Sequence, residues 1–168
     1  SRLKLPLWVY SDTFMDGATQ KKLVDFVKNG GMLVINPVLP KKDLNDRVNE
    51  YLVKAFRLDY QVKYARIIDT LVGDICTSAE NACVFKTEPG DDVIATTLEK
   101  EVCGLVRSIG KGKVMVIGFP INDKFRIIRD YFKLLCRKIG MKKVTVTSSD
   151  DLTVTVRKNR AGARTCRD

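Results

Sequence analysis

The first 37 residues alternate between two short apolar runs and one amphipathic segment, and this pattern constrains the fold more than any other feature. Residues 5–10 are apolar and rich in β-favouring side chains, which is typical of a buried strand. Asp16 then provides an N-cap for a helix that we expect to reach Lys28 and to end at residues 29–31, Asn-Gly-Gly. A second apolar run, residues 32–35, predicts another strand. Strand, helix and strand in so short a stretch predict a βαβ unit with parallel strands.

The next segment carries apolar residues at helical spacing. Leu44, Val48, Leu52 and Phe56 recur with Tyr51 and Ala55 on one face, which predicts an amphipathic helix over residues 44–56.

The middle of the chain has strand signals but no clear order. Residues 60–62 and 65–68 fit either short strands or loops, whereas residues 82–85 and 93–97 predict strands on either side of a turn at 88–91. Two further apolar runs, 102–109 and 113–119, flank Gly110-Lys111-Gly112 and predict a β-hairpin.

The last third begins with a helix pattern. Asn122 or Asp123 can cap a helix that ends at Gly140, and two strands are expected at 143–147 and 152–157. Residues 159–168 are polar and basic, and we expect no closing strand there.

Two glycine-containing segments are candidates for a phosphate-binding loop. Gly30 and Gly31 end a helix instead of starting one, and Gly110-Lys111-Gly112 lies between two strands. Neither has the spacing of a P-loop or a dinucleotide fingerprint, so turn formation is the better interpretation. The acidic pairs at 91–92 and 150–151 likewise fit turns better than general acid–base catalysis.

The chain of 168 residues contains no histidine, which excludes Ser-His-Asp and Cys-His catalysis from the chain alone. Its five cysteines, at positions 76, 83, 103, 136 and 166, have spacings unsuited to a CxxC metal pair or a disulfide framework. We expect reduced thiols, with Cys103 and Cys136 buried, in a cytoplasmic protein without metal or cofactor.

The basic excess is concentrated in one region. Residues 107–143 contain eleven Lys and Arg against two Asp, a net +9 of the chain's +10. Arg126, Arg129, Lys133 and Arg137 are spaced to form a basic stripe along the expected helix. Such a stripe fits nucleic-acid phosphates, a solvated helix face or an acidic neighbouring domain.

Taken in order, these motifs resemble one family. The strand ending at residues 11–12, the segment 23–31 (LVDFVKNGG), the strand 32–35, the segment 106–114 (VRSIGKGKV) and residues 117–119 (IGF) resemble the middle domain of microbial β-galactosidases of glycoside hydrolase families 42 and 35. The resemblance covers about residues 3–140. It implies a non-catalytic domain, often involved in oligomerisation, with a class I glutamine amidotransferase-like fold: a flavodoxin-like three-layer α/β sandwich with a mostly parallel sheet.

The resemblance also implies a domain organisation. Residues 1–142 would form the amidotransferase-like α/β domain, and residues 143–168 would be a C-terminal β extension, the start of a following β domain or a tail. A catalytic barrel would precede them in the same polypeptide, so we expect a fragment of a longer chain. An amidotransferase-like enzyme would place its nucleophilic cysteine where this chain has Asn36-Pro37, so amidotransferase chemistry is not expected.

We therefore expect a structural or oligomerisation domain of a glycoside hydrolase, β-galactosidase-like or exo-β-glucosaminidase-like, which forms a homo-oligomer and meets carbohydrate through the parent enzyme. No catalytic residue is expected in this segment. Substrate-proximal candidates follow the strand ends, where ligands collect in open α/β sheets: Ser11, Asp12, Asn36 and residues 119–122, including Asn122. Asp12 and Asn36 also fit caps or turns.

The sequence leaves two alternative functions open. One is a free-standing basic module that binds nucleic acid or another polyanion through the stripe. The other is an enzyme in its own right with a carboxylate-based site.

Overall fold

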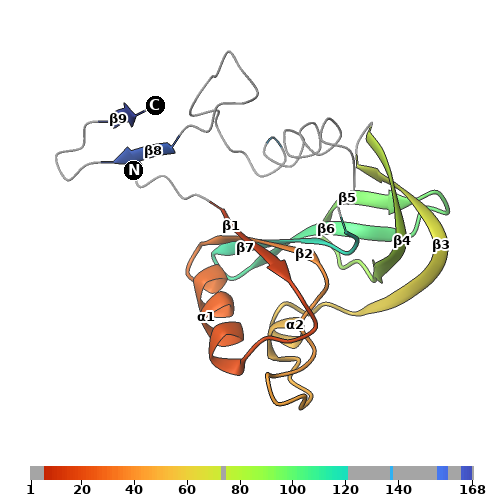
Figure 1. The fold of residues 1–168 in the computed structure, drawn as a ribbon, viewed down its shortest axis with the longest axis horizontal. Coiled ribbons are helices and arrows are strands. Elements are labelled where there is room, and N and C mark those ends of the chain that lie inside the picture. The colour runs from red at the N-terminus through yellow and green to blue at the C-terminus, as the bar shows by residue number, and fades with distance from the viewer. Residues whose placement is uncertain (1–5, 73–74, 121–136, 138–154, 159–163, 168) are drawn as a thin grey trace. The chain divides into compact units, whose positions relative to one another are not determined.

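The computed structural model describes residues 6–72, 75–120, 137, 155–158 and 164–167. The chain divides into two units, Ser1–Leu134 and Leu135–Asp168, each of which is described by itself. The described part of the first unit contains a seven-stranded sheet and two helices (Figure 1), in the order β1 (Leu7–Ser11), α1 (Gly17–Lys28), β2 (Met32–Pro37), α2 (Tyr51–Ala55), β3 (Tyr60–Val72), β4 (Ile75–Phe85), β5 (Asp92–Thr97), β6 (Val102–Ile109) and β7 (Gly112–Ile117). The second contains the antiparallel pair β8 (Thr155–Lys158) and β9 (Arg164–Arg167).

The predicted βαβ unit is confirmed. β1 and β2 pair in parallel with Val9 opposite Ile35, and α1 connects them. Asp16 caps the helix as expected, because its Oδ1 accepts the Thr19 backbone N–H at 2.9 Å. Gly30 follows the helix with a positive φ of 99°, a conformation that glycine adopts without steric cost.

The expected mostly parallel, flavodoxin-like sheet is wrong. The strand order is β1-β2-β7-β6-β5-β3-β4, and only β1–β2 and β2–β7 pair in parallel among the described strands. The other four neighbouring pairs are antiparallel. The connections explain this: β5 and β6 are separated by residues 98–101, and β6 and β7 by residues 110–111. Links this short join antiparallel strands, whereas a parallel pair needs a crossover of about a dozen residues or more.

The predicted helix over 44–56 forms only at its C-terminal end, as α2. Residues before it are held in a loop by Asp43, whose Oδ1 accepts the backbone N–H groups of Asn45 and Arg47 at 2.8 and 3.0 Å. Asp and Asn side chains compete with helix formation by such local hydrogen bonds. Leu44 and Val48 are therefore 73% and 77% exposed instead of buried.

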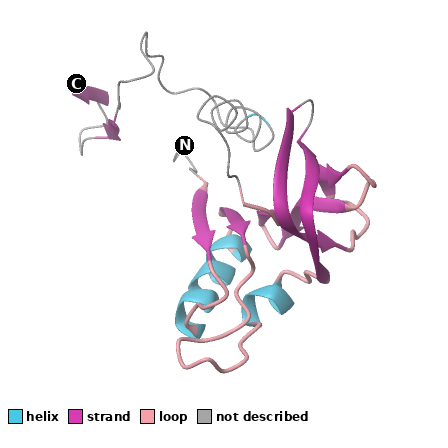
Figure 2. Ribbon diagram, turned by 45° about the vertical axis from the view of Figure 1, so that its right-hand side comes forward, coloured by secondary structure: helices cyan, strands magenta, loops and turns pink. Residues whose placement is uncertain are grey.

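The main core lies where both helices pack on the sheet, on the same side of β1 and β2 (Figure 2). Its buried members include Leu23, Val24 and Val27 of α1, Leu52 and Val53 of α2, and Leu33, Ile35, Leu105, Val114 and Val116 of the sheet. The alternate residues Val34, Met115 and Ile117 are also buried, which explains why residues 32–35 and 114–117 form continuous apolar runs.

The uncertain middle segment forms the hairpin of β3 and β4, the longest strands described. The strands expected at 82–85 and 93–97 are confirmed within β4 and β5, and the hairpin around Gly110 is confirmed as β6–β7. β9 is a strand in a segment where none was expected, and β8 overlaps only the end of the predicted strand 152–157. Apart from Arg137, the helix expected after residue 122 lies outside the described residues, as does the strand expected at 143–147.

The glycine segments have structural roles. A Cβ on Gly112 would collide with the carbonyl oxygens of Val27 and Gly31, so glycine permits the β6–β7 hairpin to approach the end of α1. Lys111 N–H donates to Lys28 O at 3.1 Å across this contact. Cys103 is buried as predicted, and Cys83 is also buried; both are free thiols. Cys136 lies outside the described residues.

Candidate functional site

The strand-end residues Ser11, Asp12 and Asn36 lie at one edge of the sheet, where parallel β1, β2 and β7 end. Ser11 is buried opposite Pro37, and its Oγ donates to Asp12 O at 3.2 Å. Asp12 is exposed and accepts the Thr13 N–H at 2.6 Å, as a turn-forming side chain does. These two candidates are thus engaged in local structure.

Asn36 is buried with 1% of its surface exposed. Its Nδ2 donates to Ile117 O at 3.1 Å and to Phe119 O at 2.7 Å, which ties β2 to the segment that follows β7. Both amide hydrogens are therefore occupied by main-chain carbonyl groups. Asn36 holds the strand ends together, and in this arrangement it offers no free donor to a ligand.

Asn122 and the stripe residues Arg126, Arg129 and Lys133 lie outside the described residues. Arg137, the fourth stripe residue, is exposed. Polyanion binding by the stripe therefore stays a prediction.

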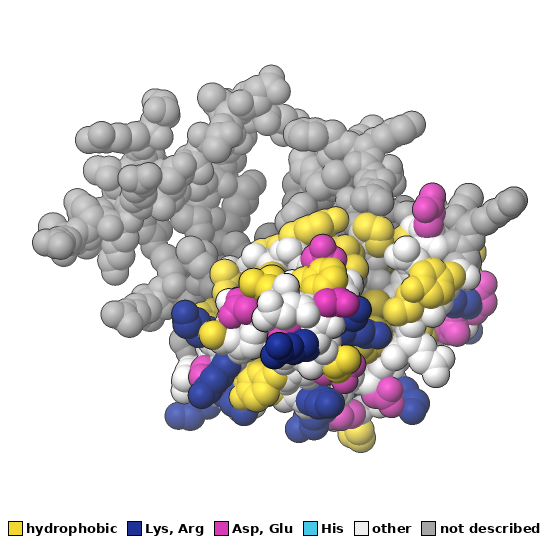
Figure 3. Space-filling model, turned by 60° about the horizontal axis from the view of Figure 1, so that its bottom comes forward, with side chains coloured by type: hydrophobic (Ala, Val, Ile, Leu, Met, Phe, Trp, Pro, Cys, Tyr) yellow, Lys and Arg dark blue, Asp and Glu magenta, His cyan; other side chains and the backbone are white. Residues whose placement is uncertain are grey.

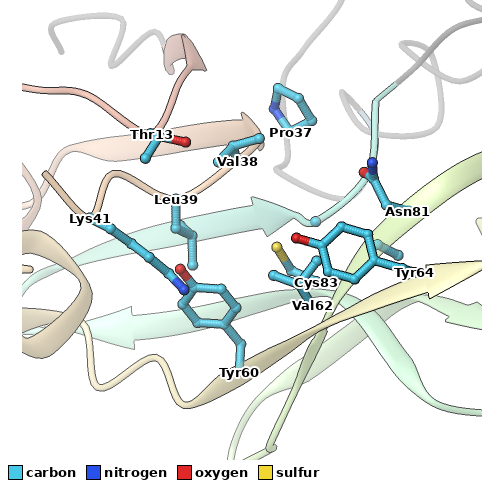
Figure 4. Close-up of a pocket in the computed structure, with 12 residues that line it drawn as sticks. Thr13, Pro37, Val38, Leu39, Lys41, Tyr60, Val62, Tyr64, Asn81 and Cys83 are labelled. Atoms are coloured by element: carbon cyan, nitrogen blue, oxygen red, sulfur yellow. The ribbon is translucent and has the colours of Figure 1, made fainter.

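A hollow of about 290 Å³ opens beside the same sheet edge. The end of β2 and the loop after β1 form one side, and the β3–β4 hairpin forms the other (Figure 4). Its polar lining residues are Thr13, Lys41, Tyr60, Tyr64, Asn81 and Cys83, and its apolar wall includes Pro37, Val38, Leu39 and Val62. Ser11, Asp12 and Asn36 do not line the hollow, and its lining residues come from segments that are far apart in sequence.

Three polar groups in the hollow affect one another. Lys41 Nζ lies 4.7 Å from the centroid of the Tyr60 ring, within cation–π range. Burial raises the pKa of Tyr60, and the nearby Cys83 adds to this rise. Burial raises the pKa of the Cys83 thiol to about 11, although the Lys41 charge opposes the rise. Both groups are therefore protonated at neutral pH, and neither is a ready nucleophile or base.

Sequence reasoning missed two buried polar residues. Gln20 is fully buried: its Nε2 donates to Met15 O and Asn49 O at 3.0 Å each, and its Oε1 accepts the Leu52 N–H at 2.9 Å. Arg107 belongs to the basic region of the sequence, yet its side chain is only 2% exposed and is paired with Asp91. In each case the sequence carries a signal, because the polar residue occupies a position on the apolar face of α1 or β6.

Comparison with known proteins gives the family. The profile of the family described as GLMA-like, second domain, matches residues 3–92, more than half of the chain. The chain belongs to this family. The GLMA-like match overlaps the region in which the motifs resembled the middle domain of β-galactosidase-type glycoside hydrolases, and that resemblance is confirmed.

Two curated relatives and one solved structure illustrate the position of this GLMA-like domain. It is 36% identical over 122 residues to an exo-β-D-glucosaminidase of Thermococcus kodakarensis, covering 69% of this chain and 15% of that protein. It is 28% identical over 155 residues to a β-1,2-glucosyltransferase of Ignavibacterium album, covering 91% of this chain and 22% of that protein. A GH42 β-galactosidase from G. stearothermophilus shares the fold with a TM-score of 0.73 at 18% identity, covering 92% of this chain and 24% of that one. The chain thus spans about a fifth of the length of the proteins it matches.

In the described part of the chain, none of the helices has the length and apolar character that a membrane span requires.

Proposed function

We propose that this chain is a non-catalytic domain of a glycoside hydrolase that acts on β-linked sugars and is β-galactosidase-like or exo-β-glucosaminidase-like. The observation that carries the proposal is the match to the GLMA-like second-domain family, together with the similarity of this chain to two exo-β-D-glucosaminidases. The catalytic barrel of the same polypeptide supplies the chemistry, and this domain packs against it. We further propose that residues 1–142 form the α/β domain and that residues 143–168 extend it. We also propose that the protein is cytoplasmic.

The engagement of the acidic side chains supports a non-catalytic role. Glycoside hydrolysis generally needs two carboxyl groups that face each other across the sugar, about 5–9.5 Å apart. Several of the described acids are engaged in ion pairs instead: Asp91 with Arg107, Glu101 with Lys63 and Asp59 with Lys86. No Asp or Glu occurs among the described residues that line the hollow.

The test is an assay of the 168-residue chain on p-nitrophenyl β-galactoside and β-glucosaminide. We expect no turnover above buffer, and we expect the coding region upstream to encode a barrel of about 200–400 residues with two catalytic carboxylates. Turnover that co-elutes with the chain during size exclusion would overturn the non-catalytic role. An upstream region without a barrel would overturn the glycoside hydrolase assignment.

The oligomerisation role is assigned to the loop of residues 41–50. Asp43 and the ion pair between Lys42 and Asp46, 2.7 Å apart, hold this loop while it exposes Leu44 and Val48. Contiguous exposed apolar surface marks contact sites, and Leu44 and Val48 place two exposed apolar side chains on the same short loop. Figure 3 shows hydrophobic side chains interspersed with basic and acidic ones on the lower face of the unit. We propose that a second copy of the chain covers Leu44 and Val48.

A further inference from the structure

The loop of residues 41–50 is fixed by hydrogen bonds within itself and to the chain after β1. The backbone N–H groups of Lys41 and Lys42 donate to Thr13 O at 2.9 and 3.0 Å. The Asn49 N–H donates to Lys41 O at 2.7 Å and closes the loop. The loop therefore holds its exposed side chains in place before a partner arrives, and little conformational entropy is lost on contact.

The most exposed large apolar side chains of the described residues gather at this loop and at the hollow. Leu44 and Val48 project from the loop, and the Tyr64 ring, which is 81% exposed, lines the hollow. In the described part of the chain, only Tyr10 is exposed to a similar degree. Lys41 lines the hollow and also begins the loop, so the two features are neighbours on the surface. One contact that covers both features therefore removes three of these side chains from water.

The hollow has the size and the walls to receive a leucine side chain. Its volume is about 290 Å³, whereas an apolar cavity of about 150 Å³ already accepts benzene, which is larger than the side chain of leucine. Figure 4 shows Val38 and Leu39 on one side of the hollow and Val62 and Tyr64 on the other. Leu44 is not among the described residues that line the hollow of its own chain. A leucine that enters there therefore comes from another molecule.

The charges of the two features have opposite signs. The whole chain has a net charge of +10, so two copies repel each other unless they meet where charge is balanced. Lys41 is the only charged side chain among the described residues that line the hollow. Residues 42–50 carry two basic and three acidic side chains, a net −1. The loop of one copy therefore complements the hollow of a second copy in charge as well as in polarity.

We propose that two copies of the chain form a closed pair in which the loop 41–50 of each copy enters the hollow of the other. Leu44 lies between Val38 and Val62 of the second copy, and Val48 covers its Tyr64 ring. Because the loop and the hollow are neighbours, a two-fold axis between them allows each copy to give one loop and to receive one. The inference rests on the proposed self-association through Leu44 and Val48, and it adds the surface that receives them.

Sedimentation equilibrium of the 168-residue chain and of two variants tests the receiving surface. Wild type should fit a monomer–dimer equilibrium, because the reciprocal contact closes at two copies. Val62→Lys places a charge in the hollow and should weaken self-association at least about tenfold. Val93→Lys is the matched control, because Val93 is also a strand residue and is 41% exposed against 38% for Val62. It should change the association constant by less than about twofold.

A mixing experiment tests whether the loop meets the hollow directly. Leu44→Asp and Val62→Lys should each associate weakly alone, because both contacts of the pair are then disrupted. In a mixed pair, the new carboxylate meets the new ammonium group in one contact, and the other contact keeps both native side chains. The 1:1 mixture should therefore associate at least about tenfold more tightly than either variant alone. Restored association also shows that both variants are folded.

The outcomes separate this inference from the proposed self-association. Wild-type association of Val62→Lys, an equal loss in Val93→Lys, or a mixture no tighter than its components would overturn the contact between loop and hollow. Assemblies larger than two copies would overturn the closed pair. In each of these cases the self-association through Leu44 and Val48 still stands, whereas a wild-type chain that stays monomeric would overturn both.

Discussion

Arg107 and Asp91 form a buried, two-point ion pair. Arg107 Nε donates to Asp91 Oδ1 at 2.8 Å and Nη2 donates to Oδ2 at 2.6 Å, and the two side chains are only 2% and 3% exposed. The same guanidinium donates to the carbonyl oxygens of Phe56, Arg57 and Lys86. One side chain of β6 therefore connects the end of α2, the end of β4 and the turn before β5.

Replacement of Asp91 by Asn should destabilise the chain by about 3–5 kcal/mol at pH 7, because it removes the buried carboxylate that meets Arg107 at two points. Among the described residues, only Glu88 then remains as a counterion, with its Oε1 3.6 Å from Arg107 Nη1. Arg107 holds the pKa of Asp91 below its usual range. The pair therefore stabilises the fold above the ordinary Asp pKa of about 3.9, and this contribution is lost as the pH falls through the lowered folded-state pKa.

Urea unfolding of wild type and Asp91→Asn at several pH values measures this. The difference in unfolding free energy between wild type and Asp91→Asn should be constant near neutral pH and should become smaller below about pH 4. A gap that does not change with pH would contradict the assigned role of the Asp91 charge.

Gly112→Ala should destabilise the chain by about 1–3 kcal/mol, the usual cost of overpacking, because the new methyl group collides with the carbonyl oxygens of Val27 and Gly31. Ser108→Ala, at an exposed position of the same hairpin, is the matched control and should stay within about 0.5 kcal/mol of wild type. Thermal and urea unfolding of wild type and both variants measure these changes in stability. Equal stabilities would mean that the hairpin can move away from α1 at little cost.

Asn36→Ala should lower stability by about 1–3 kcal/mol, since Ile117 O and Phe119 O lose their donor. Asp12→Ala, at the exposed neighbouring strand end, should change it by less than about 0.5 kcal/mol. If Asn36 instead served ligand recognition alone, Asn36→Ala would unfold at the same urea concentration as wild type.

Leu44→Asp should weaken self-association of the chain at least about tenfold, because it places a charge in the proposed contact between copies. Leu98→Asp is the same substitution at a turn position that is 58% exposed, against 73% for Leu44, and should leave association unchanged. Sedimentation equilibrium over a range of concentrations measures both. A wild-type chain that stays monomeric throughout would reject the proposed interface.

Local patterns predicted the elements that depend on residues close in sequence. The βαβ unit follows from apolar runs, the Asp16 cap and the Gly30 stop, and the β6–β7 hairpin follows from the glycine turn. The motif order also indicated the family. Local reasoning failed at residues 44–50, where apolar residues have helical spacing but backbone N–H groups instead donate to a single side chain, Asp43.

Sequence alone thus determined the βαβ unit, the absence of histidine chemistry in this chain and the family resemblance. Only the tertiary structure decided the mixed sheet, the burial of Arg107, and the hollow that is lined by Lys41, Tyr60 and Asn81. The physical reason is that these features depend on which strands become neighbours. β4 lies at one end of the sheet order and β1 at the other, and the hollow depends on the chain after β1 and β2 meeting the β3–β4 hairpin, a juxtaposition that no local pattern encodes.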